Sequence, residues 1–290
     1  MKKLKSLALT LSLFLSLFQT GLAATTADIL FIVDESGSMS AEHTWIGNMV
    51  TTLDSGLNAA GVSGNRYGLI GYGAYTSHGL TGHSHTVGGG LFGSAAELVT
   101  ATGSLTASGV TEDGYEAMNF AFSNYSFRPT AAVNVILITD EDRDIVDAAL
   151  NRAGILGLFT ARNALLNAIV DVTLQDGNLD YALGVDADSN AYTPDGMGGY
   201  NTSGGGTAMS GFGTTINDYV DLAFSTGGAV WDLNQLRNGG LTADAFTQAF
   251  IDIKVGEITS QQPAAIPLPT AWLLMLPGLG SLAFFTKRTT

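Results

Sequence analysis

The stretch DILFIVDESGS, residues 28–38, decides the fold class of this chain. Residues 28–33 form a short, mostly apolar run, which is typical of a strand buried on both faces of a parallel sheet. Asp34 comes directly after this run, and Ser36 and Ser38 follow in a loop that contains glycine. The sequence therefore predicts a buried first strand whose carboxyl end carries several oxygen ligands.

Outward from this strand, apolar runs alternate with amphipathic segments. A helix is predicted at residues 41–60, where apolar residues recur at helical spacing, and a second strand at residues 67–72. The other expected elements are a hairpin at 81–90 that leads to an edge strand, helices at 94–102, 112–122 and 243–253, strands at 133–139, 181–185 and 228–232, and one or two helices within 145–169. This alternation predicts an α/β domain, doubly wound, with helices flanking a mostly parallel central sheet.

The domain is expected to span residues 24–258. Residues 186–213 contain so much Gly, Asn, Ser and Asp that they are interpreted as an irregular insertion. Residues 259–266 are interpreted as a short linker to the C-terminal tail.

The charge of the chain excludes one class of partner. The net charge of the whole chain is −14. Without the five basic residues near the two ends, the chain has seven basic and 26 acidic residues, a net charge of −19. Such a surface repels phosphate backbones and attracts cations, so nucleic-acid binding is not expected. The chain has no cysteine, which excludes disulfides and thiolate metal sites.

The first 23 residues have the order of a secretory signal peptide. Three lysines precede residue 6, an apolar run covers residues 7–18, and small residues lead to Ala23. We expect export and cleavage after Ala23. The alternative is an uncleaved membrane anchor, for which this apolar run is short.

The C-terminal tail, residues 267–290, is interpreted as a sorting signal. It holds Pro267, Leu268 and Pro269, a hydrophobic helix at 271–285, and then Lys287 and Arg288. This order resembles the PEP-CTERM signal, although Leu268 stands where that signal has glutamate. The resemblance implies recognition by an exosortase at the inner membrane, which the hydrophobic helix would enter transiently. A permanent transmembrane anchor is the alternative.

The loop after the first strand resembles the metal-ion-dependent adhesion site, D-x-S-x-S, of von Willebrand factor A domains. Here the motif is Asp34, Ser36 and Ser38. Thr111 matches that family's loop threonine, and Asp140, directly after a predicted strand, matches its second aspartate. The resemblance covers residues 28–258 and implies one bound Mg²⁺, since Mg²⁺ prefers oxygen ligands. Two neutral hydroxyls would leave the ion able to accept an acidic group from a partner.

Additional acids surround the two matched loops. Glu112 and Asp113 follow the threonine, and Glu141 and Asp142 stand where the family has glycine. Glu112, Asp113 and Asp142 are therefore candidate auxiliary ligands, and their charge favours Ca²⁺ over Mg²⁺, with Mn²⁺ as a further alternative ion.

The histidines offer a second, weaker metal motif. In a strand, His83 and His85 would place two imidazoles on one face, as in a transition-metal site, but a solvated loop is the favoured interpretation. No motif indicates a nucleophilic triad, so the chain is not expected to be an enzyme.

These patterns predict an exported or cell-surface adhesion module that captures a protein or polysaccharide through an acidic group on the partner. A structural protein of the envelope or extracellular matrix without a working metal site is the alternative. A metal-assisted hydrolase is a third hypothesis.

Overall fold

The structure, a computed structural model, describes residues 24–74 and 82–262. The predicted signal peptide with Ala23, and the sorting tail at 267–290, lie outside these residues. No helix in the described part of the chain is long and apolar enough to cross a membrane.

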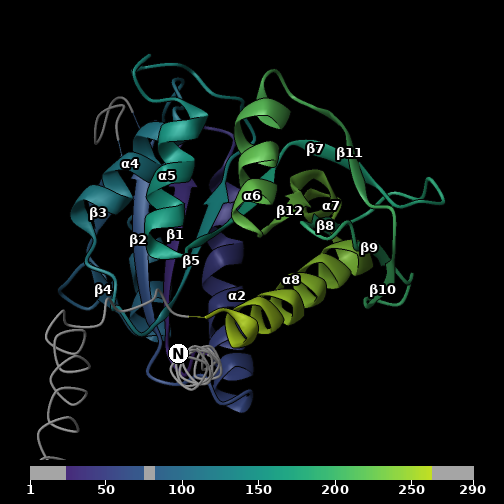
Figure 1. The fold of residues 1–290 in the computed structure, drawn as a ribbon, viewed down its shortest axis with the longest axis horizontal. Coiled ribbons are helices and arrows are strands. Elements are labelled where there is room, and N and C mark those ends of the chain that lie inside the picture. Colours follow the sequence, from purple (N-terminus) through teal and green to yellow (C-terminus); the bar gives the residue numbers. More distant parts are fainter. Residues whose placement is uncertain (1–23, 75–81, 263–290) are drawn as a thin grey trace, which may run out of the picture.

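A central sheet of ten strands organises the molecule (Figure 1). Its members are β1 Ala27–Asp34, β2 Arg66–Tyr72, β3 His83–His85, β4 Phe92–Gly93, β5 Ala132–Ile138, β6 Leu165–Val170, β8 Gly184–Asp186, β9 Ala191–Pro194, β10 Tyr200–Ser203 and β12 Ala229–Asp232. The order is β10-β9-β8-β12-β6-β5-β1-β2-β3, and β4 also pairs with β2. The five strands from β12 to β2 are parallel and the others pair antiparallel, so the predicted mostly parallel α/β sheet is confirmed.

Strand order places the candidate site at a switch point of the sheet. From β1 the chain moves outward to β2 and β3, and it then returns to the other side of β1 to form β5. The loops after β1 and β5 therefore leave the same edge in opposite directions, and doubly wound sheets bind ligands in the crevice that this reversal creates.

Helices cover both faces of the sheet. They are α2 Ser40–Ala59, α3 Ala95–Thr102, α4 Gly114–Asn124, α5 Arg152–Arg162, the π-helical turn η1 Ile216–Val220, α6 Asp221–Thr226, α7 Leu233–Arg237 and α8 Gly240–Ser260. The apolar faces of α2, α3 and α8 pack on one side, and those of α4, α5 and α6 on the other. Along β1, Phe31 belongs to the first core and Ile32 to the second, as the two-residue repeat of a strand requires.

Two segments differ from the sequence prediction. Within residues 145–169, only α5 is helical, and the apolar run that follows is the central strand β6. Asn163 ends the helix with a left-handed φ of 49°, a backbone change that apolar periodicity does not reveal. The predicted linker also begins too early, because α8 continues to Ser260.

The Gly-rich insertion at 186–213 is more regular than its composition indicates. It contains β9 and β10 at the edge of the main sheet, and β11 Thr207–Gly211, which pairs with β7 Val172–Gln175. Asp186 and Asp195 each accept main-chain N–H groups within their own turns. The polar residues thus shape hairpin turns between short strands.

Asp232, at the end of β12, makes stability depend on pH. Burial raises its pKa to about 6, whereas an unfolded aspartate titrates near pH ~4. Between these values the unfolded state binds fewer protons than the folded state, so stability falls as pH rises and then levels off above about pH 7. Asp232→Asn keeps an acceptor for the N–H of Asn234, which Asp232 caps, and removes the titration.

Urea unfolding gives the free energy of unfolding of Asp232→Asn and of wild type at pH 4.5 and at pH 7.5. We expect the variant's stability relative to wild type to be greater at pH 7.5 than at pH 4.5 by an amount on the order of 2 kcal/mol. An identical difference at both pH values would show that Asp232 titrates normally.

Candidate functional site

The carboxyl group of Asp34 is held rigidly beneath the edge of the sheet. Ser36 N donates to its Oδ1 at 2.6 Å and Thr139 Oγ1 donates to its Oδ2 at 2.7 Å, while His43 Nε2 lies 3.0 Å from its main-chain oxygen. Burial raises the pKa of Asp34 to about 7, and the charge of Asp140 adds to this effect, although the hydrogen bonds from Ser36 and Thr139 oppose it. The buried carboxyl group of Asp34 is therefore harder to ionise than that of a solvent-exposed aspartate.

A chain of oxygen atoms joins the β1 loop to the β5 loop. Ser38 Oγ donates to Asp140 Oδ1 at 2.9 Å, and the hydroxyls of Ser36 and Ser38 lie 3.1 Å apart. Since the hydrogen of Ser38 is given to Asp140, Ser36 donates to Ser38. Asp34, Ser36, Ser38 and Asp140 thus come together from positions up to 106 residues apart, and they present two carboxylates and two hydroxyls.

The loop before α4 brings a further carboxyl group toward Asp34. Gly73 has a positive φ of 82°, and a Cβ there would lie 3.3 Å from Glu112 Cγ and 3.5 Å from both Asp34 Oδ1 and Thr111 O. The main chain of Thr111 therefore lies close to Asp34. Burial raises the pKa of Glu112 to about 8, and the charges of Asp34 and Asp144 add to the increase. The site therefore gathers carboxyl groups whose ionisation is energetically costly.

Asp113 and Asp142 have other partners. Asp113 caps α4 and forms a buried ion pair with Arg143, with 2.7 Å between Asp113 Oδ1 and Arg143 Nε. Asp142 Oδ2 accepts from the N–H of Thr214 at 2.9 Å. Asp113 therefore stabilises the fold, and Asp142 holds the loop at Thr214. Glu112, in contrast, faces the site beside Asp34.

Arg237, in α7, is a site residue that the sequence motif does not identify. Its guanidinium donates to Asp140 Oδ2 at 2.9 Å, to Glu42 Oε1 at 2.8 Å and to Ser38 O at 3.2 Å. It therefore ties α7 and α2 to the loops that follow β1 and β5 and leaves Asp140 Oδ1 on the Ser38 side. A cavity of about 290 Å³ opens beside it, lined by Ser38, Ala41, Glu42, Trp45, Leu236 and Arg237.

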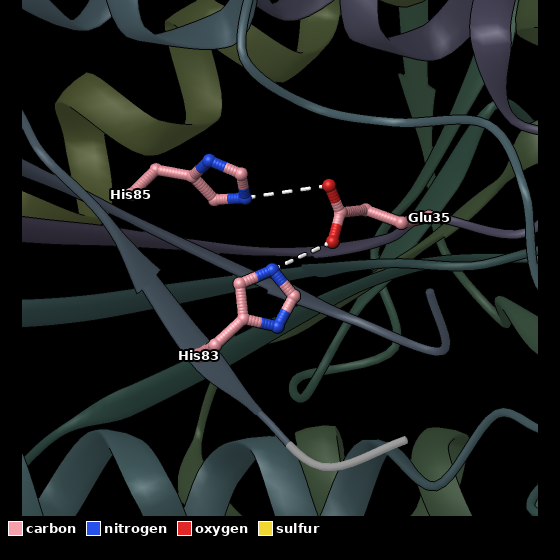
Figure 2. A group of neighbouring side chains, drawn as sticks. All are labelled: Glu35, His83 and His85. Atoms are coloured by element: carbon pink, nitrogen blue, oxygen red, sulfur yellow. Dashed lines mark ion pairs between the residues drawn. The ribbon is translucent and has the colours of Figure 1, made fainter. Parts of the chain in front are cut away.

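A second cluster lies on the opposite face of the same strand end. Glu35 follows Asp34, and its carboxylate meets the imidazoles of His83 and His85 (Figure 2). Burial would raise the pKa of Glu35, but the hydrogen bonds from His83 and His85 outweigh burial and hold this pKa below its usual range. The solvated-loop interpretation of the two histidines is wrong, because they belong to strand β3.

The chain matches no protein-family model and no curated protein. Solved structures that resemble it include proximal thread matrix protein 1 from the mussel byssus, with a TM-score of 0.37 and 18% identity over 53% of this chain and 38% of that one. Another is the vWF domain of the type V pili tip protein Mfa5 from Porphyromonas gingivalis, with a TM-score of 0.32 and 17% identity over 42% of this chain and 40% of that one.

A third is the conserved hypothetical protein BatB from Bacteroides thetaiotaomicron, with a TM-score of 0.45 and 12% identity over 80% of this chain and 99% of that one. The chain spans about two fifths of the length of the first two structures.

Proposed function

We propose that this chain is an exported binding module that holds one divalent cation at Asp34, Ser36, Ser38 and Asp140, beside the loop of Thr111, and captures its partner there. The observation that carries the proposal is the hydrogen bond of 2.9 Å between Ser38 and Asp140, which joins the two loops at the switch point. When bound, the cation would accept an acidic oxygen from a protein or polysaccharide.

The donor chemistry fits a hard cation. The four residues offer carboxylate and hydroxyl oxygens, which suit Mg²⁺, Ca²⁺ or Mn²⁺ better than softer metals. The raised pKa values of Asp34 and Glu112 support the same proposal, because a cation nearby would stabilise their ionised forms. We propose Mg²⁺ first, with Ca²⁺, which the surrounding acids favour, or Mn²⁺ as the alternatives.

The neighbouring cavity supports a binding role. It lies beside Ser38 and Arg237 and is partly walled by Trp45, so a partner that places a carboxylate at the cation has room for an adjacent group. Arg237 already pairs with Glu42 and Asp140, which leaves the cation as the main attraction for an acidic partner.

Capture from the native surface fraction tests this function. Wild-type protein should retain a partner in Mg²⁺ and release it in chelator, and Asp34→Ala should retain none under either condition. A partner held equally by both proteins in chelator would favour a structural role without a metal, and turnover of that partner would favour the hydrolase.

Export and sorting are part of the proposal and have their own test. Removing residues 267–290 should release the rest of the chain as a folded species into the periplasm or medium, because the tail supplies the hydrophobic segment and the basic pair. Mass spectrometry of the native surface fraction should find the mature chain without its tail. An intact end with Lys287 and Arg288 would establish a permanent anchor and exclude exosortase processing.

A further inference from the structure

We propose that Glu35, His83 and His85 form a second metal site, selective for Zn²⁺ or a similar borderline transition metal. This site is separate from that of Asp34 and does not rest on the proposed function. Glu35 directly follows β1 and its N–H still donates to Tyr72 O in β2. The alternation of side chains along the strand therefore extends to it, and Asp34 meets the β5 loop on one side while Glu35 meets β3 on the other.

The register of the edge strand brings the three side chains together. In the antiparallel pair of β2 and β3, His83 lies opposite Gly71 and His85 lies opposite Leu69. Two residues apart in a strand, the histidines share one face. Figure 2 shows each imidazole directed at a different oxygen of the Glu35 carboxylate.

The distances match a metal-ligand set. His83 Nε2 lies 2.8 Å from Glu35 Oε2, His85 Nε2 lies 3.3 Å from Oε1, and one ligand atom from each residue can be chosen so that all lie within 4.8 Å of one another. Ligands at zinc bond lengths in a tetrahedral site are roughly 3.3 Å apart, so the two histidine–glutamate distances are already near this value, and the remaining separation would have to close by about 1.5 Å at most. Two imidazoles and one carboxylate suit zinc and leave a fourth position open.

Hydrogen bonds behind the ligands hold them in position. Ser104 Oγ donates to Ala101 O at 2.6 Å, so it accepts from Nδ1 of His85 at 2.7 Å. Because Nδ1 keeps its proton for Ser104, a metal that replaces the proton shared by Nε2 and Glu35 would meet the Nε2 lone pair, which is the usual arrangement for a ligating histidine. The N–H of Thr106 donates to Glu35 Oε1 at 2.7 Å and orients the carboxylate.

Gly71 provides the space that the cluster occupies. A Cβ at this position would lie 2.6 Å from Glu35 Cδ and 2.7 Å from His85 Nε2, so the ligands converge above a residue that has no side chain. Side-chain exposure is 0% for Glu35, 6% for His85 and 19% for His83. The site is therefore enclosed, and His83 is its most exposed side chain.

Zinc titration of the full chain tests the proposal. The protein is stripped of metal and saturated with Mg²⁺, and Zn²⁺ binding is then measured by calorimetry. We expect one zinc equivalent for wild type and affinity reduced by about tenfold or more in Glu35→Gln, His83→Gln and His85→Gln. Ser84→Ala, an exposed position between the two histidines, is the matched control and should bind as wild type does.

Asp34→Ala separates the two sites. It should lose Mg²⁺ and keep Zn²⁺, whereas loss of Zn²⁺ in this variant, or wild-type zinc affinity in His85→Gln, would overturn the proposal. X-ray absorption spectroscopy of the zinc-loaded wild type identifies the atoms that bind the zinc, and its result does not depend on whether a variant folds. Two imidazole ligands are expected, and a shell of oxygens alone would show that the cluster is only an ion pair.

Discussion

Replacing Asp34 with alanine is expected to weaken divalent-cation binding at the proposed site by roughly 100-fold or more, equivalent to about 2.8 kcal/mol. Asp34 is fully buried, accepts hydrogen bonds from Ser36 and Thr139, and is the strand-end carboxylate around which the loop is built. Its removal eliminates a negative charge that attracts the cation, and it also removes the hydrogen bonds from Ser36 and Thr139 that hold the loop. Calorimetric titration with Mg²⁺, Mn²⁺ and Ca²⁺ measures the change.

Two further variants separate charge from shape. Asp34→Asn keeps an acceptor for Ser36 N but removes the charge, so its affinity should fall nearly as far as that of the alanine variant. Ser36→Ala removes a neutral hydroxyl and should have a milder effect. All three should stay folded without metal, because the strands on both sides of β1 bury their apolar faces independently of the ion. Equal loss of affinity in Ser36→Ala and Asp34→Asn would contradict the assigned role of charge.

Asp113→Ala is expected to lower the free energy of unfolding by about 3–5 kcal/mol, because it leaves a buried arginine without its partner. Arg143 has a side-chain exposure of 5% and pairs with Asp113 at 2.7 Å, and Asp113 also caps α4 through the N–H groups of Tyr115 and Glu116. Urea unfolding with and without Mg²⁺ measures the loss.

The same variant tests whether Asp113 is a metal ligand. At a temperature where the variant is folded, its cation affinity should equal that of wild type. Adding Arg143→Met should recover part of the stability, since it removes the unpaired charge. A variant that is as stable as wild type but binds no cation would make Asp113 a ligand and would reassign the loop before α4.

The first half of the fold follows from local pattern. The apolar run of β1 and the helical spacing of α2 are signals within single segments, and both elements lie within two residues of the predicted bounds. The approach of Asp34 to Asp140 was also predictable, because residues after parallel neighbouring strands meet at one edge. For β6, with residues LLNAIV, a run of six apolar or buried positions does not distinguish strand from helix.

The parts of the two sites that the sequence did not predict depend on distant contacts. Arg237 reaches Asp140 from α7, a helix of five residues with no motif of its own. His83 and His85 meet Glu35 only because β3 pairs antiparallel with β2 in a particular register. A shift of one residue would place both imidazoles on the other face, and nothing local determines that register.

One cation is proposed to lie between the β1 and β5 loops. Anomalous scattering from crystals of the protein soaked in Mn²⁺ locates the ion directly. We expect a peak within coordination distance of Ser38 Oγ and Asp140 Oδ1 in the wild-type crystals and no such peak in Asp34→Ala crystals. No peak between these two residues in the wild-type crystals, at a concentration of Mn²⁺ that saturates binding in solution, would contradict this position of the cation.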